Sequence, residues 1–436
     1  MVDEEEIKFK NAYTAIFTSN YFFQGVNTSV YSVIIPIYLI KLTGKLSAAD
    51  LAFLASIILI PWGLKVFYGM ISDKYPIKNL GRRKPYILGS MALAGLLWLL
   101  LSIPNITTPN NAILLFTLAG VLINFGVAIA DTALDGLIID ICPKKKLGRT
   151  QGFCWGMNSV GMIIGGPLLA FLLVSVELIN VQIIFIIVGI SMILISSLIL
   201  IIKEKEEFYD VKIKKHLKEM FNNKRDWLGY IYSMLRSLLD GVIILLISII
   251  ILIKTGIIKA NGATLSLESQ DMSIYLYQAN ISLIVSIGII IGAIAGGRIA
   301  DLKTRKFSVI LSVIITFISL ILLVMDFTII SILLFVACLA GLALGWRRAI
   351  AAAILGELAK NHPEMDSTSF SISMAFANIG ASIGLFFTGI VINITKDFSA
   401  TFLYLALFSL LVVIPLILMN PKDYEYKLRE NELSRI

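Results

Sequence analysis

Long stretches without any charged residue are the feature that most restricts how this chain can fold. No charged residue occurs between Pro85 and Ala130 or between Val181 and Ile202. A helix needs about 20 apolar residues to cross the hydrocarbon core of a bilayer, and runs of this length supply them. Charged residues make up only 15% of the 436-residue chain, too few to cover the surface of a water-soluble protein of this size. The chain is therefore predicted to be an all-α membrane protein.

Apolar stretches of membrane-spanning length recur twelve times along the chain. Several exceed a minimal crossing, so the corresponding helices are expected to tilt or to extend beyond the lipid. The predicted transmembrane helices cover residues 12–40, 48–73, 85–104, 111–142, 150–175, 181–203, 228–254, 272–301, 307–326, 328–357, 367–395 and 398–420. We expect a multi-pass protein of the cell membrane, with the lipid bilayer as its surroundings.

Basic residues are unevenly divided between the loops on the two sides of the membrane. The loops that follow even-numbered helices, on the side of the N-terminus, carry most of the lysines and arginines. Basic loops are retained in the cytoplasm, so both termini are predicted to be cytoplasmic. The net charge of +8 is thus a topology signal, and no nucleic-acid partner is expected.

A charged stretch divides the predicted helices into two sets of six. Residues 203–227 mix both signs of charge and are predicted to be a cytoplasmic linker. This linker would join an N-terminal six-helix bundle, residues 1–202, to a C-terminal six-helix bundle, residues 228–421. Residues 422–436 would form a cytoplasmic tail.

Corresponding features repeat across this linker. The loop after the second predicted helix contains Asp73, and the loop after the eighth contains Asp301 followed by Arg305. The fifth and eleventh helices each carry an asparagine followed by glycines, at Asn158 and Asn378. The repeats indicate a duplicated six-helix unit, an arrangement in which two halves can rock around a shared site.

Pairs of glycines four residues apart occur in several predicted helices. Because glycine has no side chain, two helices approach closely at such pairs, and we interpret them as packing seams. The pairs are Gly152/Gly156, Gly161/Gly165, Gly292/Gly296, Gly341/Gly345 and Gly380/Gly384.

Ionisable residues inside the predicted helices are the candidate functional residues. Each costs about 3 kcal/mol on insertion scales, so such groups usually face a cavity and have partners. The candidates for substrate binding and coupling are Lys65, Asp131, Asp135, Arg236, Asp240, Arg347 and Arg348, together with Gln24 and Asn27 of the first helix.

The two aspartates of the fourth helix are candidate proton carriers. Asp131 and Asp135 are four residues apart and therefore lie on one helix face. Two carboxylates close together in a poorly hydrated place do not both stay ionised cheaply, so the pair is expected to hold a proton. A structural salt bridge, from the fourth helix to the tenth or through Lys65 to the second, is the alternative.

The arginines of the tenth helix are candidate anion ligands. Arg347 and Arg348 occupy the place in the second half that corresponds to the aspartates of the first. A guanidinium group binds carboxylate or phosphate in a fork. We hypothesise that one of them binds an anionic substrate group or pairs with Asp131 when the protein is empty. Arg236 and Asp240, four residues apart, could instead simply neutralise each other.

The loop after the second helix resembles the signature of the major facilitator superfamily. GMISDK (69–74) is followed there by GRRK (81–84), which gives a glycine, an aspartate, a second glycine and basic residues. The resemblance covers essentially the whole chain and implies the major facilitator fold, with twelve helices in two six-helix pseudo-repeats. In that family the loop latches the cytoplasmic gate. The implied gate residues are Gly69, Asp73, Gly81, Arg82 and Arg83, with Asp301 and Arg305 as counterparts.

A narrower resemblance covers roughly residues 60–165. PWGLKVFYGMISDKYPIKNLGRRKPY (61–86) and ADTALDGLIID (130–140) are similar to the folate–biopterin transporter branch. The long YPIKNL spacer also occurs in the glycoside–cation symporter branch. The antiporter signature of the fifth helix is matched in part, so symport and antiport both remain open; the matching residues are Gly152, Gly161, Gly165, Gly166 and Pro167.

The predicted function is secondary active transport of a small polar, anionic or zwitterionic solute by alternating access, coupled to protons or another ion. We expect a monomer without a cofactor or catalytic site. The rival classes are a channel, a non-transporting receptor on the same fold, and an intramembrane polyprenyl transferase that holds magnesium on Asp131 and Asp135. Such an enzyme needs a second acidic cluster, where this chain has Arg347 and Arg348.

Overall fold

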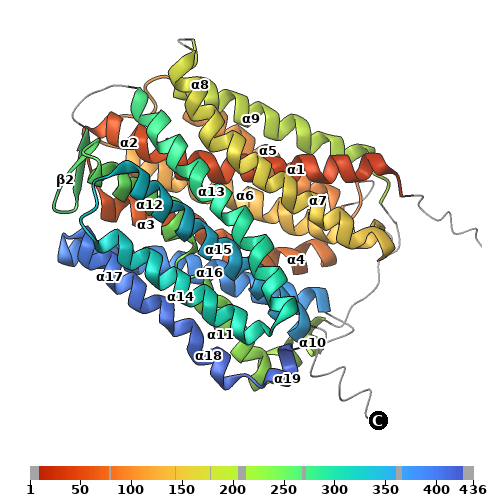
Figure 1. Cartoon of the computed structure of the whole chain (residues 1–436). Helices are drawn as coiled ribbons and strands as arrows, with labels where there is room; N and C mark the ends of the chain where they lie inside the picture. The colour runs from red at the N-terminus through yellow and green to blue at the C-terminus, as the bar shows by residue number, and fades with distance from the viewer. Residues whose placement is uncertain are drawn as a thin grey trace, which may run out of the picture. The chain divides into compact units, whose positions relative to one another are not determined.

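The computed structural model describes residues 9–77, 80–142, 144–176, 178–204, 213–267, 272–359 and 366–425. Twelve helices in these ranges are long and apolar enough to cross a membrane (Figure 1). They are Asn11–Thr43, Ala48–Ser72, Lys84–Leu101, Ala112–Ile138, Phe153–Ser175, Val181–Ile201, Lys224–Lys254, Ser273–Ala300, Arg305–Val324, Ile330–Ala359, Thr368–Thr395 and Phe398–Leu418. Each agrees with a predicted helix to within a few residues at either end, which confirms the twelve-helix prediction.

The chain divides into two compact units, which are described separately. Unit 1 comprises Met1–Tyr38 and Leu64–Val211, and unit 2 comprises Leu39–Gly63 and Lys212–Ile436. These boundaries differ from those of the predicted bundles, because residues 39–63 of the first half pack as part of unit 2. Two contacts explain this placement: a short strand in the segment pairs with a later strand, and the helix after it packs along a later helix.

Unit 1 is an all-helical unit with an aromatic core. Trp98 packs against Phe185 and Tyr31, with ring centroids 5.1 and 5.2 Å away. Its elements are α1 (Asn11–Ser29), the π-helical turn η1 (Val30–Ile34), the start of α2 (Ile35–Thr43), α4 (Lys65–Lys74), α5 (Lys84–Leu101), α6 (Ala112–Ile141), α7 (Lys144–Ile163), the π-helical turn η2 (Ile164–Leu168), α8 (Leu169–Ser175), α9 (Val181–Ser197) and η3 (Leu198–Ile201).

A glycine seam joins α1 to α7 in unit 1. A Cβ added at Gly161 would lie 2.0 Å from the carbonyl oxygen of Phe22, and one at Gly165 would lie 2.6 Å from that of Val26. The two backbones are therefore in direct contact, as predicted for this pair. Gly156, in contrast, has no neighbour within 4 Å of an added Cβ, so the predicted seam is wrong at that position.

Unit 2 contains the remaining helices and a small sheet. In Figure 1, α14 runs alongside α17, and its contacts also place it against α15. The elements are the rest of α2, β1 (Lys45–Ser47), α3 (Ala48–Gly63), α10 (Ile213–Asn222), α11 (Lys224–Ser237), α12 (Asp240–Lys254), β2 (Ile258–Asn261), β3 (Thr264–Leu267), α13 (Ser273–Leu302), α14 (Arg305–Val324), α15 (Ile330–Ala359), α16 (Asp366–Thr395), α17 (Phe398–Ser409), η4 (Leu410–Val412), α18 (Val413–Leu418) and α19 (Pro421–Tyr424).

The sheet of unit 2 was not foreseen from the sequence. Its antiparallel order is β1-β3-β2, with Lys45 opposite Ser266 and Ser47 opposite Thr264. Gly262 begins the turn between β2 and β3 with a φ of 59°, a left-handed conformation that glycine adopts without steric cost. The sheet fixes the segment before α3 to the segment after α12.

Glycine seams also organise unit 2. A Cβ at Gly292 would lie 1.9 Å from the carbonyl oxygen of Leu342, and one at Gly384 would lie 1.6 Å from that of Leu238. The seams between α13 and α15 and between α11 and α16 therefore form as predicted. Helix α3 packs on the same α16, where the hydroxyls of Ser56 and Ser382 each donate to the other's carbonyl oxygen at 2.8 Å.

Two of the membrane-spanning helices are interrupted, and both interruptions lie beside charged residues. The second is divided into α3 and α4 at Leu64, directly after Pro61 and Gly63, and α4 begins with Lys65. The seventh is divided into α11 and α12, and α12 begins with Asp240. Pro61, which lacks a backbone donor and clashes with the turn before it, lies inside α3 three residues before this break.

Candidate functional site

The predicted aspartates of α6 form a charged cluster with Lys65 in unit 1. The ammonium of Lys65 pairs closely with Asp131 Oδ2 and lies 4.0 Å from Asp135 Oδ2. The Asp131 side chain is only 6% exposed, whereas that of Asp135 is 36% exposed. The interruption before α4 places Lys65 against α6, so the structural salt bridge considered between the second and fourth helices is present. The cluster has two negative charges and one positive charge.

The first helix adds a phenol to this acidic cluster. The Tyr21 hydroxyl donates to Asp135 Oδ1, a contact that the sequence did not indicate because tyrosine carries no charge at neutral pH. Gln24 and Asn27, the two polar residues of this helix predicted to bind substrate, are both buried. Asn27 accepts a hydrogen bond from the Trp98 indole nitrogen at 3.0 Å, which holds it in the aromatic core. Gln24 lies one helical turn before it on α1.

The arginines form a second cluster in unit 2, around a single carboxylate. Arg348 Nε donates to Asp240 Oδ2 at 3.1 Å. Arg236 Nη1 lies 3.6 Å from the same oxygen, and Arg347 Nη2 lies 3.5 Å from Oδ1. The structure thus brings together all four residues predicted on the seventh and tenth helices. Asp240 is paired with Arg236, in agreement with the alternative that these two residues neutralise each other. Asp240 also pairs with Arg347 and Arg348.

This basic cluster is buried but incompletely hydrogen-bonded. The Arg347 side chain is 5% exposed, and its Nε and Nη2 atoms have no hydrogen-bond partner in the described part of the chain. The same holds for Nε and Nη1 of Arg236. Arg348, at 40% exposed, is the accessible member. Buried guanidinium donors without an acceptor are costly, so they mark a place where an anion would be stabilised.

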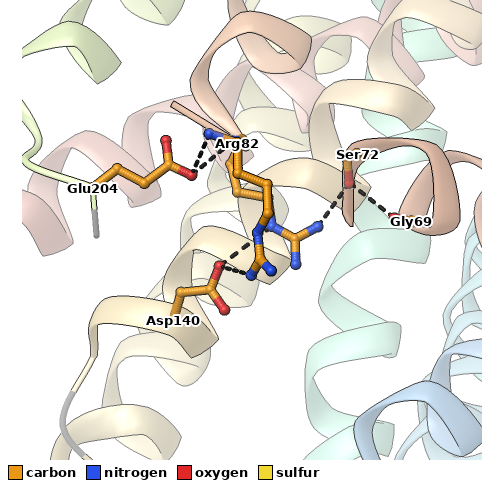
Figure 2. Close-up of polar contacts among 6 residues, drawn as sticks. Gly69, Ser72, Arg82, Asp140 and Glu204 are labelled. Atoms are coloured by element: carbon orange, nitrogen blue, oxygen red, sulfur yellow. Dashed lines mark hydrogen bonds and ion pairs between the residues drawn. The ribbon is translucent and has the colours of Figure 1, made fainter. Parts of the chain in front are cut away.

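The loop between α4 and α5 is held by ion pairs and backbone contacts in unit 1. Figure 2 shows Arg82 between two carboxylates: its Nη2 lies 2.6 Å from Asp140 Oδ2, and its backbone N–H donates to Glu204 Oε1 at 3.0 Å. Arg83 also contacts both, through its Nε and its backbone N–H. Gly81 has a φ of 95°, a left-handed conformation that glycine adopts without steric cost and that allows the tight turn of this loop. Asp140, near the end of α6, therefore holds the loop through both arginines.

Small residues make room for this arrangement. A Cβ at Gly136 would lie 2.5 Å from Arg83 Cζ, so only glycine lets that guanidinium lie against α6. Arg83 Nη1 also donates to the Ser72 hydroxyl at 2.7 Å, and Ser72 donates to the carbonyl oxygen of Gly69 at 3.1 Å (Figure 2). Gly69 thus contributes its backbone oxygen.

An equivalent arrangement holds the start of α14 in unit 2. The backbone N–H groups of Arg305 and Lys306 donate to the carboxylate of Glu425 at 3.0 and 2.9 Å. Arg305 Nη1 lies 3.6 Å from Glu357 Oε2 and also donates to the carbonyl oxygen of Tyr424. Burial, with Glu425 alongside, raises the pKa of Tyr424 to about 12, so its phenol stays protonated at neutral pH.

The two capping glutamates were missed by sequence reasoning, although a signal was present. Glu204 and Glu425 each follow the last membrane-spanning helix of their half. Glu204 accepts from the two residues directly before α5, and Glu425 accepts from the first turn of α14. Carboxylates are favoured there by the unpaired N–H groups and the helix dipole. The side chains of Asp73 and Asp301, predicted in the gate, lie outside the described part of the structure.

Comparison with protein families identifies the fold. The family model described as Major Facilitator Superfamily matches residues 17–258 and again residues 229–435. The chain belongs to the major facilitator superfamily. This major facilitator is a multi-pass membrane protein, as the resemblance of its second loop implied, and the two matches cover both halves.

Curated relatives of this major facilitator are transporters. Folate-biopterin transporter 4 of Arabidopsis thaliana is 29% identical over 168 residues, 38% of this chain and 33% of that protein. The folate-biopterin transporter of Synechocystis is 32% identical over 151 residues, 34% of this chain and 28% of its own length. A transporter named AmpG 1 from Rickettsia conorii is 29% identical over 269 residues, 59% of this chain and 62% of its own length. The matches thus span less than two thirds of each relative.

Solved structures show the same fold at low identity. The nucleoside transporter NupG superposes with a TM-score of 0.67 at 13% identity, over 93% of this chain and 98% of its own. A D-xylose-proton symporter superposes with a TM-score of 0.63 at 15% identity, over 91% of this chain and 96% of its own. Within the described residues, no three His, Cys, Asp or Glu side chains form a group that could hold a metal ion.

Proposed function

We propose that this major facilitator is a secondary active transporter, not an enzyme, and that it moves a small anionic or zwitterionic solute by alternating access with coupling to protons. One observation carries the proposal. Each compact unit has a cluster of ionisable side chains beside a helix interruption, and these two clusters have opposite net charges. Charges inside a membrane protein are costly and usually mark the path of a substrate or a proton.

The basic cluster of unit 2 supports an anionic substrate group. Three guanidinium groups face one carboxylate there, so the cluster has a net charge of +2. Arg348 is accessible, and Arg347 has unused donors behind it. An arriving carboxylate or phosphate would satisfy donors that Asp240 leaves unpaired, which gives the interaction its driving force.

The acidic cluster of unit 1 supports proton coupling. Lys65 neutralises one carboxylate, so the cluster of Lys65, Asp131 and Asp135 has a net charge of −1. Addition of one proton makes it neutral, which a poorly hydrated environment favours. Asp135 is the better carrier, because it is more exposed and lies farther from Lys65 than Asp131 does. From the sequence, the two aspartates were expected to share a proton. Because Lys65 neutralises Asp131, Asp135 is the excess carboxylate that would take the proton.

The loop arrangements around Arg82, Arg83 and Arg305 support a gate. Each ties the start of a helix to the end of the last helix in the same half, so each unit would move as one body during alternating access. The basic loops favour a cell-membrane protein with both termini in the cytoplasm. We propose a monomer as the transporting form.

The named relatives suggest a second candidate for the solute. Two of them are folate-biopterin transporters, and the similarity at residues 60–165 points to the same branch. A pterin-like solute with an acidic side chain would fit the net charge of the arginine cluster. The partial antiporter signature of α7 and η2 leaves exchange of two anions as the alternative to proton symport.

Reconstitution in liposomes tests the proposal. Folate, glucuronate, glutamate and a phosphate monoester would be offered with an inwardly directed proton gradient, and uptake and internal pH would be followed together. We expect uptake of at least one solute with proton entry, loss of proton entry in Asp135→Asn, and loss of uptake in Arg348→Gln. Arg298→Gln, which removes an exposed arginine of α13, is the matched control. Uptake in both variants equal to the control would contradict the assigned roles.

A further inference from the structure

The geometry of the arginine cluster points to a narrower ligand class. We infer that Arg236, Arg347 and Arg348 bind one doubly charged oxyanion group, of the phosphate monoester or phosphonate class, for which Asp240 stands in when the protein is empty. The inference rests on the proposed anion transport and assigns the charge and shape of the anionic group.

Convergence on one carboxylate sets the size of the group. All three guanidinium groups lie within 3.1 to 3.6 Å of the two oxygens of Asp240. Donors that meet at one small group suit a single compact anion. Two separate carboxylates of one solute would need arginines that are spread apart.

Charge sets the valence of the group. Three guanidinium groups and one carboxylate leave two positive charges, and the described residues place no other carboxylate within 4.0 Å of these arginines. A dianion brings the buried cluster to neutrality, whereas a monoanion leaves one charge uncompensated. In a poorly hydrated environment the neutral arrangement is favoured.

The unused donors set the number of oxygens. Four nitrogen atoms, Nε and Nη2 of Arg347 and Nε and Nη1 of Arg236, make no hydrogen bond in the described structure. The two Nη atoms approach Asp240 only as ion pairs, at 3.5 and 3.6 Å, and Asp240 Oδ1 likewise accepts no hydrogen bond there. A tetrahedral oxyanion has three free oxygens that accept from several directions, whereas the planar carboxylate of Asp240 has two. Guanidinium forks match phosphate oxygens in pairs.

An oxyanion would reach the cluster through Arg348, and Asp240 is positioned to release its arginine partners. Arg348 is the exposed member, and among the described residues it makes the one hydrogen bond to Asp240 that meets ordinary geometry. Asp240 is the first residue of α12, directly after the interruption of the helix, so rotation of its side chain can free the arginine donors while its charge stays beside the cluster. An oxyanion that arrives at Arg348 would therefore compete with Asp240 for the same donors.

Sulfate and methyl sulfate form the matched pair of probes, since both are tetrahedral and differ by one charge. Their dissociation constants would be measured with the purified full-length protein in detergent at constant ionic strength. We expect sulfate to bind at least ten times more tightly than methyl sulfate. Arg347→Gln and Arg347→Lys should each weaken sulfate binding at least ten-fold, the latter because it keeps the charge and loses the fork. Arg298→Gln should have no effect.

Asp240 provides a test with the opposite sign. Asp240→Asn removes the internal competitor, so sulfate should bind at least three times more tightly. If the Asp240→Asn protein does not fold, Asp240→Ser is used for the same test. Equal binding of the two probes, with both dependent on Arg347, would overturn the dianion inference and leave anion transport intact. If neither probe depends on Arg347 or Arg348, the proposed anion transport itself is wrong. Weaker sulfate binding in a stably folded Asp240→Asn would overturn the stand-in role.

Discussion

Lys65, the first residue of α4, pairs with Asp131 of α6 inside unit 1. The pair exists because the second membrane-spanning helix is interrupted directly before Lys65, which turns the new helix start toward α6. Removal of one member of a buried pair leaves the other charge uncompensated, and this is far more costly than removal of both. The pair thus supports both the stability of unit 1 and the charge state of Asp135.

Lys65→Met should therefore destabilise the protein, by about 3–5 kcal/mol if the site stays dry, because Asp131 loses its partner. The double variant Lys65→Met with Asp131→Asn should recover most of this loss. Thermal unfolding of the purified protein in detergent measures both. A Lys65→Met protein that melts at the same temperature as the original would show that the pair contributes nothing.

The capping glutamate of unit 1 makes a second prediction. Glu204→Ala removes the acceptor for two backbone N–H groups at the start of α5 and should cost roughly 1–3 kcal/mol. Glu204→Gln should cost less, since an amide oxygen can still accept both. Melting temperatures would be compared with those of Glu425→Ala and Glu425→Gln in unit 2. If glutamine proves as damaging as alanine at both positions, the carboxylate charge and not the acceptor oxygen is what matters.

The glycine seams predict position-dependent effects of a single methyl group. Gly384→Ala would place a Cβ against the carbonyl oxygen of Leu238, so α11 and α16 would have to separate, at a cost of about 1–3 kcal/mol. Gly156→Ala, where an added Cβ meets open space, is the matched control and should be neutral or slightly stabilising. The yield of folded protein after mild heating compares the two. Equal losses would mean that helix propensity, not the seam, decides.

The sheet of unit 2 predicts a specific cross-link. Lys45→Cys with Ser266→Cys places two thiols on facing residues of β1 and β3, a separation that a disulfide spans. Lys45→Cys with Thr264→Cys, displaced by two residues along β3, should cross-link much less. Cross-linking in membranes is read from gel mobility, with Cys338→Ser as background because that native thiol is partly exposed. Equal cross-linking of both pairs would contradict the strand register.

Transport in the cross-linked protein would extend this result. Residues 39–63 pack in unit 2, and the segments that lead into and out of them contain Pro36 and the break at Leu64. If these irregular positions absorb the motion between states, uptake should survive the Lys45–Ser266 cross-link. If uptake is lost in the cross-linked protein and restored when the disulfide is reduced, the sheet must open in each transport cycle.

Much of the scaffold could be predicted from the sequence. The twelve helices follow from apolar length alone, because a chain in lipid must satisfy its backbone hydrogen bonds internally. The seams at Gly161 and Gly384 follow from the four-residue spacing of glycines, since such pairs occur where two helix backbones are in contact. Gly156 shows the limit of that rule, because the same spacing occurs on a helix face that meets nothing.

The candidate residues were found by charge, but their grouping was not. Arg236 and Asp240 were predicted to form an intrahelical pair, and Arg347 and Arg348 to be separate ligands. In the structure all three arginines share the carboxylate of Asp240. Tyr21 escaped notice because it is neutral, and Glu204 and Glu425 because they stand in charged loops where a carboxylate is ordinary.

By itself, the sequence determined that this protein lies in a membrane, how often it crosses, and which side chains are too costly to be buried without a purpose. Those conclusions depend on local composition and length, which the chain carries in order. The tertiary structure alone decided that Lys65 neutralises Asp131 and that three arginines meet at Asp240. Such partnerships depend on where two helices break and which faces then meet, and distances between helices far apart in sequence are fixed only by packing.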